Sequence, residues 1–173
     1  PLRSSAASDV YKRQVLINGK EIEIERVNLL SDLNFISPYI ELPKKLTVKQ
    51  NLKVYGKLYD VDKLESKIDY LSDKLRLGGI IDKITGELSS GQKNRVSLAK
   101  SIINDPKVLL LDEPTASLDP ETGDFVRTFL ENYQNEKGAS ILLASHNMLE
   151  VERLCCSVLM MKQGIIVDRG SPK

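Results

Sequence analysis

The sequence predicts an α/β protein with a parallel-sheet core and a helical subdomain inserted beside it. Residues 107–113 (KVLLLDE) and 140–145 (SILLAS) are short, nearly continuous apolar runs of strand length. Segments of helical period separate them, which is typical of parallel strands joined by helices and covered on both faces. Residues 47–77 instead carry two helical patterns with no strand between them, which indicates a helical insertion.

The N-terminal elements are short. Residues 15–24 (VLINGKEIEI) predict a hairpin with its turn at Asn18-Gly19, and residues 33–36 (LNFI) predict a strand ended by Ser37-Pro38. Residues 1–14 are polar and without period, so we expect a non-native or disordered leader there. The chain starts at Pro1 and stops just after a predicted strand, so we expect a piece cut at both ends.

Helices follow from apolar spacing and from capping residues. Thr47 is placed to cap a helix, and residues 61–77 carry a second apolar stripe at helical spacing. Pro120 suits the first turn of another helix. The remaining predictions are helices at 91–103, 120–134 and 148–154, and a strand at 157–161 followed by a hairpin turn at Gly164.

Composition narrows the function classes. The 173 residues hold 25 basic and 24 acidic side chains, a formal charge of +1, which gives no support to a bulk nucleic-acid-binding surface. Cys155 and Cys156 are adjacent and form no disulfide framework, which favours a reducing compartment. One histidine is present, and no Cys/His spacing suits zinc. The apolar runs are far shorter than a bilayer-spanning helix.

The stretch GELSSGQKNRVSLAK (86–100) puts small polar residues directly before a basic helix, and two interpretations stay open. Ser89 or Ser90 fits an ordinary N-cap, with Gly91 merely tolerated. The same helix start offers free N–H groups and the positive end of the helix dipole, which would suit an anion.

Two carboxylates and a histidine end the predicted core strands. Asp112 and Glu113 close the run at 107–113, where open α/β sheets place their ligand crevices. Adjacent strand residues point to opposite sides, so one acid could support a magnesium ion while the other addresses a water. His146 ends the next strand on the same edge, within reach of a phosphate or an attacking water. Solvated acids and a structural histidine are the plain alternatives.

The order of four motifs resembles the ATP-binding domain of an ABC transporter. LSSGQ (88–92) is similar to the family's signature, LLLDEPT (109–115) to its Walker B strand and SLD (117–119) to its D-loop, and His146 stands where the switch histidine is expected. The resemblance covers roughly residues 15–173. It implies a P-loop NTPase-like core of the ABC ATPase type, with residues 15–46 ending an antiparallel and core region, 47–90 the helical subdomain and 91–173 the α/β ATPase core.

The resemblance also implies roles for individual residues. Asp112 would hold Mg²⁺, Glu113 would polarise the attacking water, and His146 would contact the γ-phosphate of ATP. A second copy of the domain would hold most of that ATP. The signature residues would contact its γ-phosphate, and the D-loop residues would cross the dimer interface: Ser89, Ser90, Gly91 and Gln92 in the first group, Ser117 and Asp119 in the second.

Three departures from the family pattern limit the resemblance. The P-loop pattern G-x-x-x-x-G-K-[ST] does not occur in these 173 residues, so we expect the chain alone neither to bind ATP tightly nor to hydrolyse it. No glutamine follows the strand at 33–36, where Ser37 or Pro38 stands instead and Gln50 lies too far along. Ser90 also replaces a signature glycine.

The function that the resemblance implies is an ATP-hydrolysing subunit of a membrane transporter, of the exporter type. Its partners would be a second ATPase domain, identical or different, and a transmembrane permease. The subunit itself would be cytoplasmic, at the cytoplasmic face of the cell membrane. No nucleic acid is expected. The alternatives are a non-transport ABC ATPase acting on ribosomes or DNA, and a nucleotide-independent regulatory module.

Overall fold

The computed structural model describes residues 15–172 except 18, 25 and 117. Its first elements are an antiparallel pair, β1 (Leu16–Ile17) and β2 (Lys20–Glu21), so the predicted hairpin is confirmed, although Asn18 of its turn lies outside the described residues. A short helix, α2 (Arg26–Ser31), leads into β3 (Leu33–Ile36). Strand β3 confirms the strand predicted at 33–36, whereas α2 has no counterpart among the predicted elements.

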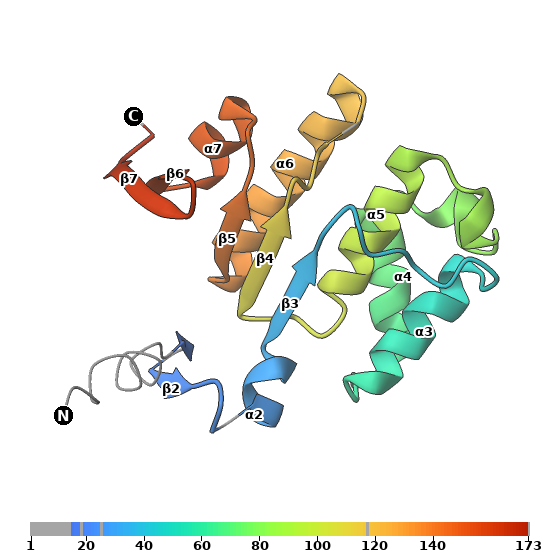
Figure 1. Ribbon diagram of the computed structural model, residues 1–173. Coiled ribbons are helices and arrows are strands. Elements are labelled where there is room, and N and C mark those ends of the chain that lie inside the picture. Colours follow the sequence, from blue (N-terminus) through green and yellow to red (C-terminus); the bar gives the residue numbers. More distant parts are fainter. Residues whose placement is uncertain (1–14, 18, 25, 117, 173) are drawn as a thin grey trace.

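The core is a three-stranded parallel sheet in the order β3-β4-β5, which confirms the predicted sheet type (Figure 1). Strand β4 (Val108–Asp112) lies in the middle and β5 (Ser140–Ala144) at one side. Leu111 pairs with Ile36 on one side and with Leu143 on the other. The carboxyl ends of all three strands therefore lie together along one edge.

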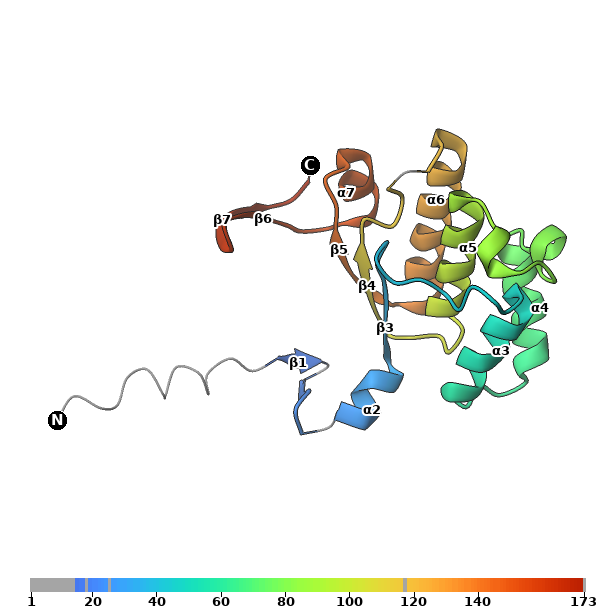
Figure 2. The ribbon, with the colours of Figure 1, turned by 45° about the vertical axis from the view of Figure 1, so that its right-hand side comes forward.

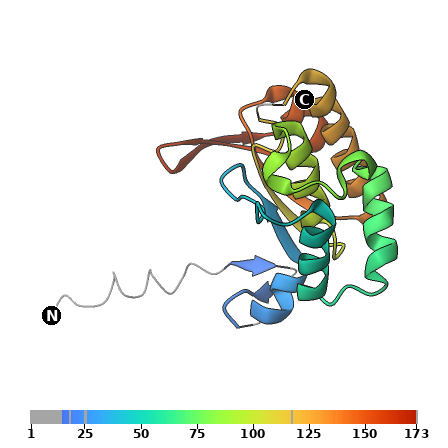
Figure 3. The ribbon, with the colours of Figure 1, turned by 90° about the vertical axis from the view of Figure 1, so that its right-hand side faces the viewer.

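Only one face of this sheet is covered by the described residues. Leu109 and Leu111 are 0% and 2% exposed and share a core with the helices α5 (Ser90–Ser101) and α6 (Pro120–Lys137). Leu142 on the other face is 66% exposed. Figures 2 and 3 show helices α3 to α6 gathered on one side of the sheet. The expectation of cover on both faces is therefore wrong for the part of the chain described here.

The predicted helical insertion contains α3 (Val48–Leu58), α4 (Leu64–Lys74) and the short 3₁₀ turns Gly78–Ile80 and Thr85–Glu87. Thr47 caps α3 as predicted, and its capping box with Gln50 satisfies two backbone N–H groups. Helix α4 is shorter than the predicted 61–77, because Lys63 and Arg76 take left-handed backbone conformations outside its two ends.

The C-terminal elements follow the prediction closely. Helix α6 runs three residues beyond the predicted end at 134, up to Gly138, whose φ of 64° forms a left-handed C-cap. Helix α7 (Met148–Leu154) has the predicted bounds. Strands β6 (Val158–Lys162) and β7 (Ile165–Gly170) pair antiparallel around the predicted turn at Gly164. Among the described residues, no helix has both the length and the apolarity needed to cross a bilayer.

Candidate functional site at the carboxyl edge of the sheet

Glu113 leaves the sheet in an unusual backbone conformation. The strand ends at Asp112, one residue before the predicted end, and Glu113 has a φ of 48°. Its N–H donates to the carbonyl of Ala144 at 2.9 Å, which holds the turn against β5. A left-handed conformation costs an L-residue about 1–2 kcal/mol and persists where surrounding contacts impose it, often at functional sites.

The two adjacent acids face different neighbours. Oδ2 of Asp112 accepts a hydrogen bond from the hydroxyl of Ser37 at 3.0 Å, on the side of β3. The carboxylate of Glu113 contacts His146, which follows β5. The predicted divergence of the two side chains is therefore present. Its cause is the left-handed turn at Glu113 as well as the alternation along the strand.

Glu113 and His146 form a close pair at the edge. Oε1 of Glu113 lies 2.7 Å from Nδ1 of His146 and also accepts the backbone N–H of His146 at 3.0 Å. The hydrogen bond and the charge of Glu113 raise the pKa of His146 above its ordinary value. The histidine side chain is 84% exposed, so it stays accessible to a ligand.

The oxygen groups around Asp112 suit a hard cation. Mg²⁺ prefers oxygen ligands and keeps several waters, and proteins usually hold it through one or two carboxylates together with substrate phosphates. Asp112 supplies a carboxylate, and Ser37 places a hydroxyl oxygen beside it. No cluster of three His, Cys, Asp or Glu side chains suited to a metal occurs among the described residues, so a caged metal site is not part of this arrangement.

The signature segment forms a complete N-cap, as one of the two interpretations predicted. The hydroxyl of Ser89 accepts the N–H of Gln92 at 3.3 Å, and Oε1 of Gln92 accepts the N–H of Ser89 at 3.0 Å. Within the described part of the chain, the N–H groups of Ser90 and Gly91 have no acceptor. The cap therefore leaves two donors at the positive end of α5, and the anion interpretation remains compatible with it.

A second helix begins beside the first. A Cβ added to Gly91 would lie 3.5 Å from Cγ2 of Thr122, so the starts of α5 and α6 pack closely. Asp119 caps α6 by accepting the N–H of Thr122 at 2.9 Å, and this hydrogen bond lowers the pKa of Asp119. Ser117, the other predicted D-loop residue, lies outside the described residues.

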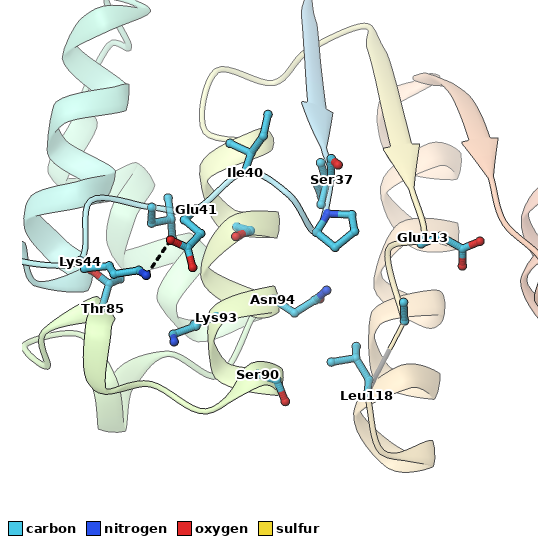
Figure 4. A pocket seen from close by; sticks show the side chains of 15 residues that line it. Ser37, Ile40, Glu41, Lys44, Thr85, Ser90, Lys93, Asn94, Glu113 and Leu118 are labelled. Carbon is cyan, nitrogen blue, oxygen red and sulfur yellow. Dashed lines mark ion pairs between the residues drawn. The ribbon is translucent and has the colours of Figure 1, made fainter.

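A pocket of about 260 Å³ opens between the segment after β3, helix α5 and the turn after β4 (Figure 4). Ser37, Ser90 and Glu113 contribute to its wall. The carboxylate of Glu113 points away from α5 in Figure 4, toward the side of β5. Asn94 of α5 donates to the carbonyl of Pro114 at 2.6 Å, which ties the signature helix to the turn.

The predicted site residues thus fall into two groups. Asp112, Glu113 and His146 gather at the sheet edge, while Ser89–Gln92 and Asp119 occupy the two adjacent helix starts. Sequence reasoning missed several polar residues that hold these groups in place. Their signal was weak, because each is a common polar residue in a turn or near the start of a helix: Ser37, Asn94, Thr115 and Glu150.

The fold and the residues at the carboxyl edge of the sheet define the structural class of the protein. A parallel sheet with acids, a histidine and helix starts outside its carboxyl ends belongs to the α/β proteins that bind ligands at that edge. The profile of the family described as "ABC transporter" then matches residues 5–116, more than half of the chain. The chain belongs to the ABC transporter family, as its motifs predicted. The match begins inside the stretch 1–14, so a leader there stays a prediction.

Curated relatives carry both import and export names. The chain is 33% identical over 129 residues to the ABC transporter ATP-binding protein NatA of Bacillus subtilis, covering 73% of this chain and 52% of NatA. It is 34% identical over 142 residues to the Nod factor export ATP-binding protein I of Rhizobium sp., covering 81% and 46%. It is 30% identical over 166 residues to the methionine import ATP-binding protein MetN 1 of Staphylococcus epidermidis, covering 92% and 49%. The chain spans about half the length of these relatives.

Solved structures agree with the fold. The cbiO1 protein of Clostridium perfringens, part of the ABC transporter complex cbiONQ, superposes with a TM-score of 0.76 at 30% identity, covering 92% of this chain and 66% of that one. The ATP-binding cassette MJ0796, in a dimeric post-hydrolysis state bound to ADP and Pi, gives a TM-score of 0.82 at 19% identity, with 92% and 73% covered. The second likeness supports the fold alone.

Proposed function

We propose that this chain is part of an ATP-hydrolysing subunit of an ABC membrane transporter. It carries two groups of residues, one at the sheet edge and one at the start of α5, each of which would form part of a nucleotide site. The Glu113–His146 pair is the observation that carries the proposal. A carboxylate held at 2.7 Å from an exposed histidine, on the ligand edge of an α/β sheet, suits the positioning of a water against a phosphate.

Each of the three residues at the sheet edge has a separate role in ATP hydrolysis. Glu113 orients and polarises the attacking water, and His146 donates a hydrogen bond to a γ-phosphate oxygen. Asp112, whose carboxylate accepts a hydrogen bond from Ser37, would hold Mg²⁺. A bound Mg²⁺ would neutralise charge on the phosphates. Phosphoryl transfer needs such positioning and charge neutralisation more than covalent catalysis. Glu113 and His146 would supply the positioning, and Mg²⁺ held through Asp112 would supply the neutralisation.

The signature group serves a second nucleotide. The N–H groups of Ser90 and Gly91 at the start of α5 have no acceptor among the described residues. They would receive the γ-phosphate of an ATP held by another copy of the domain. Ser89 and Gln92 keep that helix start in shape through their reciprocal hydrogen bonds. Ser117 and Asp119 belong to the surface where the two copies meet. One complete site therefore takes Glu113 from one copy and Gly91 from the other.

A transporter subunit of this kind has a membrane partner and a direction of transport. We infer that the subunit works with a transmembrane permease at the cytoplasmic face of the membrane and belongs to the exporter type. The Nod factor export relative supports this type, whereas the methionine import relative speaks for the opposite direction. Transport of a labelled substrate in vesicles, measured as accumulation or loss, decides the direction.

A mixing experiment tests the shared site. Two variants are made in a longer protein that contains a phosphate-binding loop upstream of Val15: Glu113→Gln, which removes the base, and Gly91→Asp, which places a carboxylate where the γ-phosphate would lie. Gly91→Asp suits the fold, since Asp is favourable in a first helical turn and a Cβ at position 91 finds ordinary contact distances. Each variant alone should hydrolyse little ATP.

An equal mixture should regain activity. Half of the dimers would then combine the two variants, and each of these would hold one intact site, giving about a quarter of the wild-type rate in a symmetric two-site dimer. A mixture as inactive as its components would contradict a site shared between copies. The substitution Glu136→Gln, at an exposed acid near the end of α6, is the matched control and should retain full activity.

A further inference from the structure

A second bridge joins the two segments that carry Glu113 and His146, and this one is buried. The hydroxyl of Thr115 donates a hydrogen bond to Oε1 of Glu150. Thr115 lies two positions after Glu113 in the turn that follows β4, and Glu150 lies four positions after His146 in the first turn of α7. The same two segments are therefore linked twice, once at the surface and once beneath it.

Burying the carboxyl group of Glu150 costs free energy, because the group loses its hydration. Glu150 is 1% exposed and Thr115 is 8% exposed. Among the described residues, the buried Oε2 of Glu150 has no hydrogen-bond partner. A carboxyl group with one partner loses much of its hydration on burial, and apolar residues of similar volume often serve packing equally well or better. Packing alone therefore does not account for a carboxyl group at this position.

The Thr115–Glu150 bond completes the support of a strained turn. The N–H of Glu113 is held by the carbonyl of Ala144, and the carbonyl of Pro114 is held by Asn94. These contacts fix the turn to β5 and to α5. The contact from Thr115 fixes the turn to α7, the helix that begins two residues after His146. A left-handed residue such as Glu113 keeps its conformation only while such contacts impose it.

We propose that Glu150 is a positioning residue which, through Thr115, keeps the carboxylate of Glu113 within hydrogen-bond reach of His146. Its carboxyl group is buried, so it acts through Thr115 and not directly on the reacting groups. The consequence for catalysis rests on the proposed function, while the effect on the Glu113–His146 pair does not depend on ATP. The two parts of the inference are therefore tested separately.

The first experiment uses the 173-residue chain and its single histidine, whose ring signals are unambiguous in NMR spectra. Thr115→Val removes the hydroxyl group and keeps the side-chain shape, whereas Thr115→Ser keeps the hydroxyl. The pKa of His146 should be lower in Thr115→Val than in the wild type, because Glu113 is no longer held beside it, and Thr115→Ser should restore it. Thr128→Val removes an exposed hydroxyl on α6 that accepts from Arg153 and should change nothing at His146. An unchanged pKa in Thr115→Val overturns the inference.

The second experiment measures ATP hydrolysis in the longer protein with a phosphate-binding loop. Thr115→Val should lower kcat about 10-fold or more while KM for ATP changes by less than about 3-fold, as expected for a misplaced catalytic group. Thr115→Ser should retain most of the wild-type kcat.

A double variant separates positioning from stability. Thr115→Val combined with Glu150→Leu replaces both polar partners by apolar groups, which should recover the thermal stability lost in the single variant. Its kcat should stay low, because the turn is no longer held by a directional bond. Recovery of kcat together with stability would show a purely structural role and overturn the inference. A wild-type protein without ATPase activity would instead contradict the proposed function and leave the NMR result to decide this inference.

Discussion

One carboxylate oxygen of Glu113 accepts from His146 twice: Oε1 lies 2.7 Å from the ring Nδ1 and 3.0 Å from the backbone nitrogen. The histidine is thereby fixed to the proposed base at two points, while its ring remains 84% exposed. The pair is placed where β4 and β5 end side by side, with Asp112 paired to Ala144 just before it.

This contact predicts a pH dependence. The pKa of His146 is raised by its hydrogen bond to Glu113 and by the charge of that carboxylate. Because the pKa in the folded state exceeds that in the unfolded state, the contact stabilises the fold fully below the unfolded pKa. That contribution is lost as pH rises through the folded pKa. Titration of the single histidine by NMR should show the raised value, and Glu113→Gln should lower it. The control Glu136→Gln should leave it unchanged.

The Asp112–Ser37 pair predicts how the longer, P-loop-containing protein depends on magnesium. Asp112→Asn removes the proposed metal ligand, so the Mg²⁺ concentration for half-maximal ATP hydrolysis should rise about 10-fold or more. Ser37→Ala removes only the hydrogen bond that steadies this carboxylate, so its effect should be smaller but in the same direction. Mg²⁺ titrations of ATPase activity measure both. Equal Mg²⁺ requirements in Asp112→Asn and the wild type would remove Asp112 from the metal site.

The missing P-loop pattern predicts weak nucleotide binding by the 173-residue chain. These 173 residues contain no loop of that pattern, whose backbone N–H groups and lysine would cradle the phosphates. The N–H groups of Ser90 and Gly91, which have no acceptor among the described residues, stay open to an anion. Calorimetric titration with Mg-ATP should give a Kd of about 1 mM or weaker. A micromolar Kd would show that the described residues hold ATP without that loop.

The two faces of the sheet differ in burial, so we expect the same Leu→Ala substitution to lower the free energy of unfolding by different amounts on each face. Leu109→Ala deletes a side chain that is 0% exposed and should lower the free energy of unfolding by about 2–5 kcal/mol. Leu142→Ala removes the same atoms from a position that is 66% exposed, and should change it by less than about 0.5 kcal/mol. Urea unfolding of both variants in this chain measures the difference. Equal losses would mean that the face carrying Leu142 is covered in solution.

Much of the fold follows from local signals in the sequence. The apolar runs at 108–112 and 140–144 could become buried parallel strands because helices of the right length separate them. Thr47 and Ser89 each precede a glutamine by three positions, and both form the capping boxes that this pattern favours. These features depend on neighbours in sequence, which is why they could be read in advance.

The features that escaped prediction depend on distant contacts. The left-handed turn at Glu113 is imposed by Ala144 and by residues of α5 and α7, so nothing within KVLLLDE indicates it. Strand β5 reads as a continuous apolar run, yet its Leu142 is exposed because the described residues leave that face open. The partnership of Thr115 with Glu150 spans 35 positions, and both residue types are common enough to carry no signal.

The most direct measurement is the single-turnover rate of ATP hydrolysis by Glu113→Gln in the longer, P-loop-containing protein, beside its affinity for ATP. We expect the Kd for ATP to change by less than about 3-fold, while hydrolysis slows at least about 100-fold because the water has lost its base. The ATP-bound variant should also accumulate as a dimer. A hydrolysis rate close to that of the wild type would contradict the assignment of Glu113 and, with it, the function proposed for the Glu113–His146 pair.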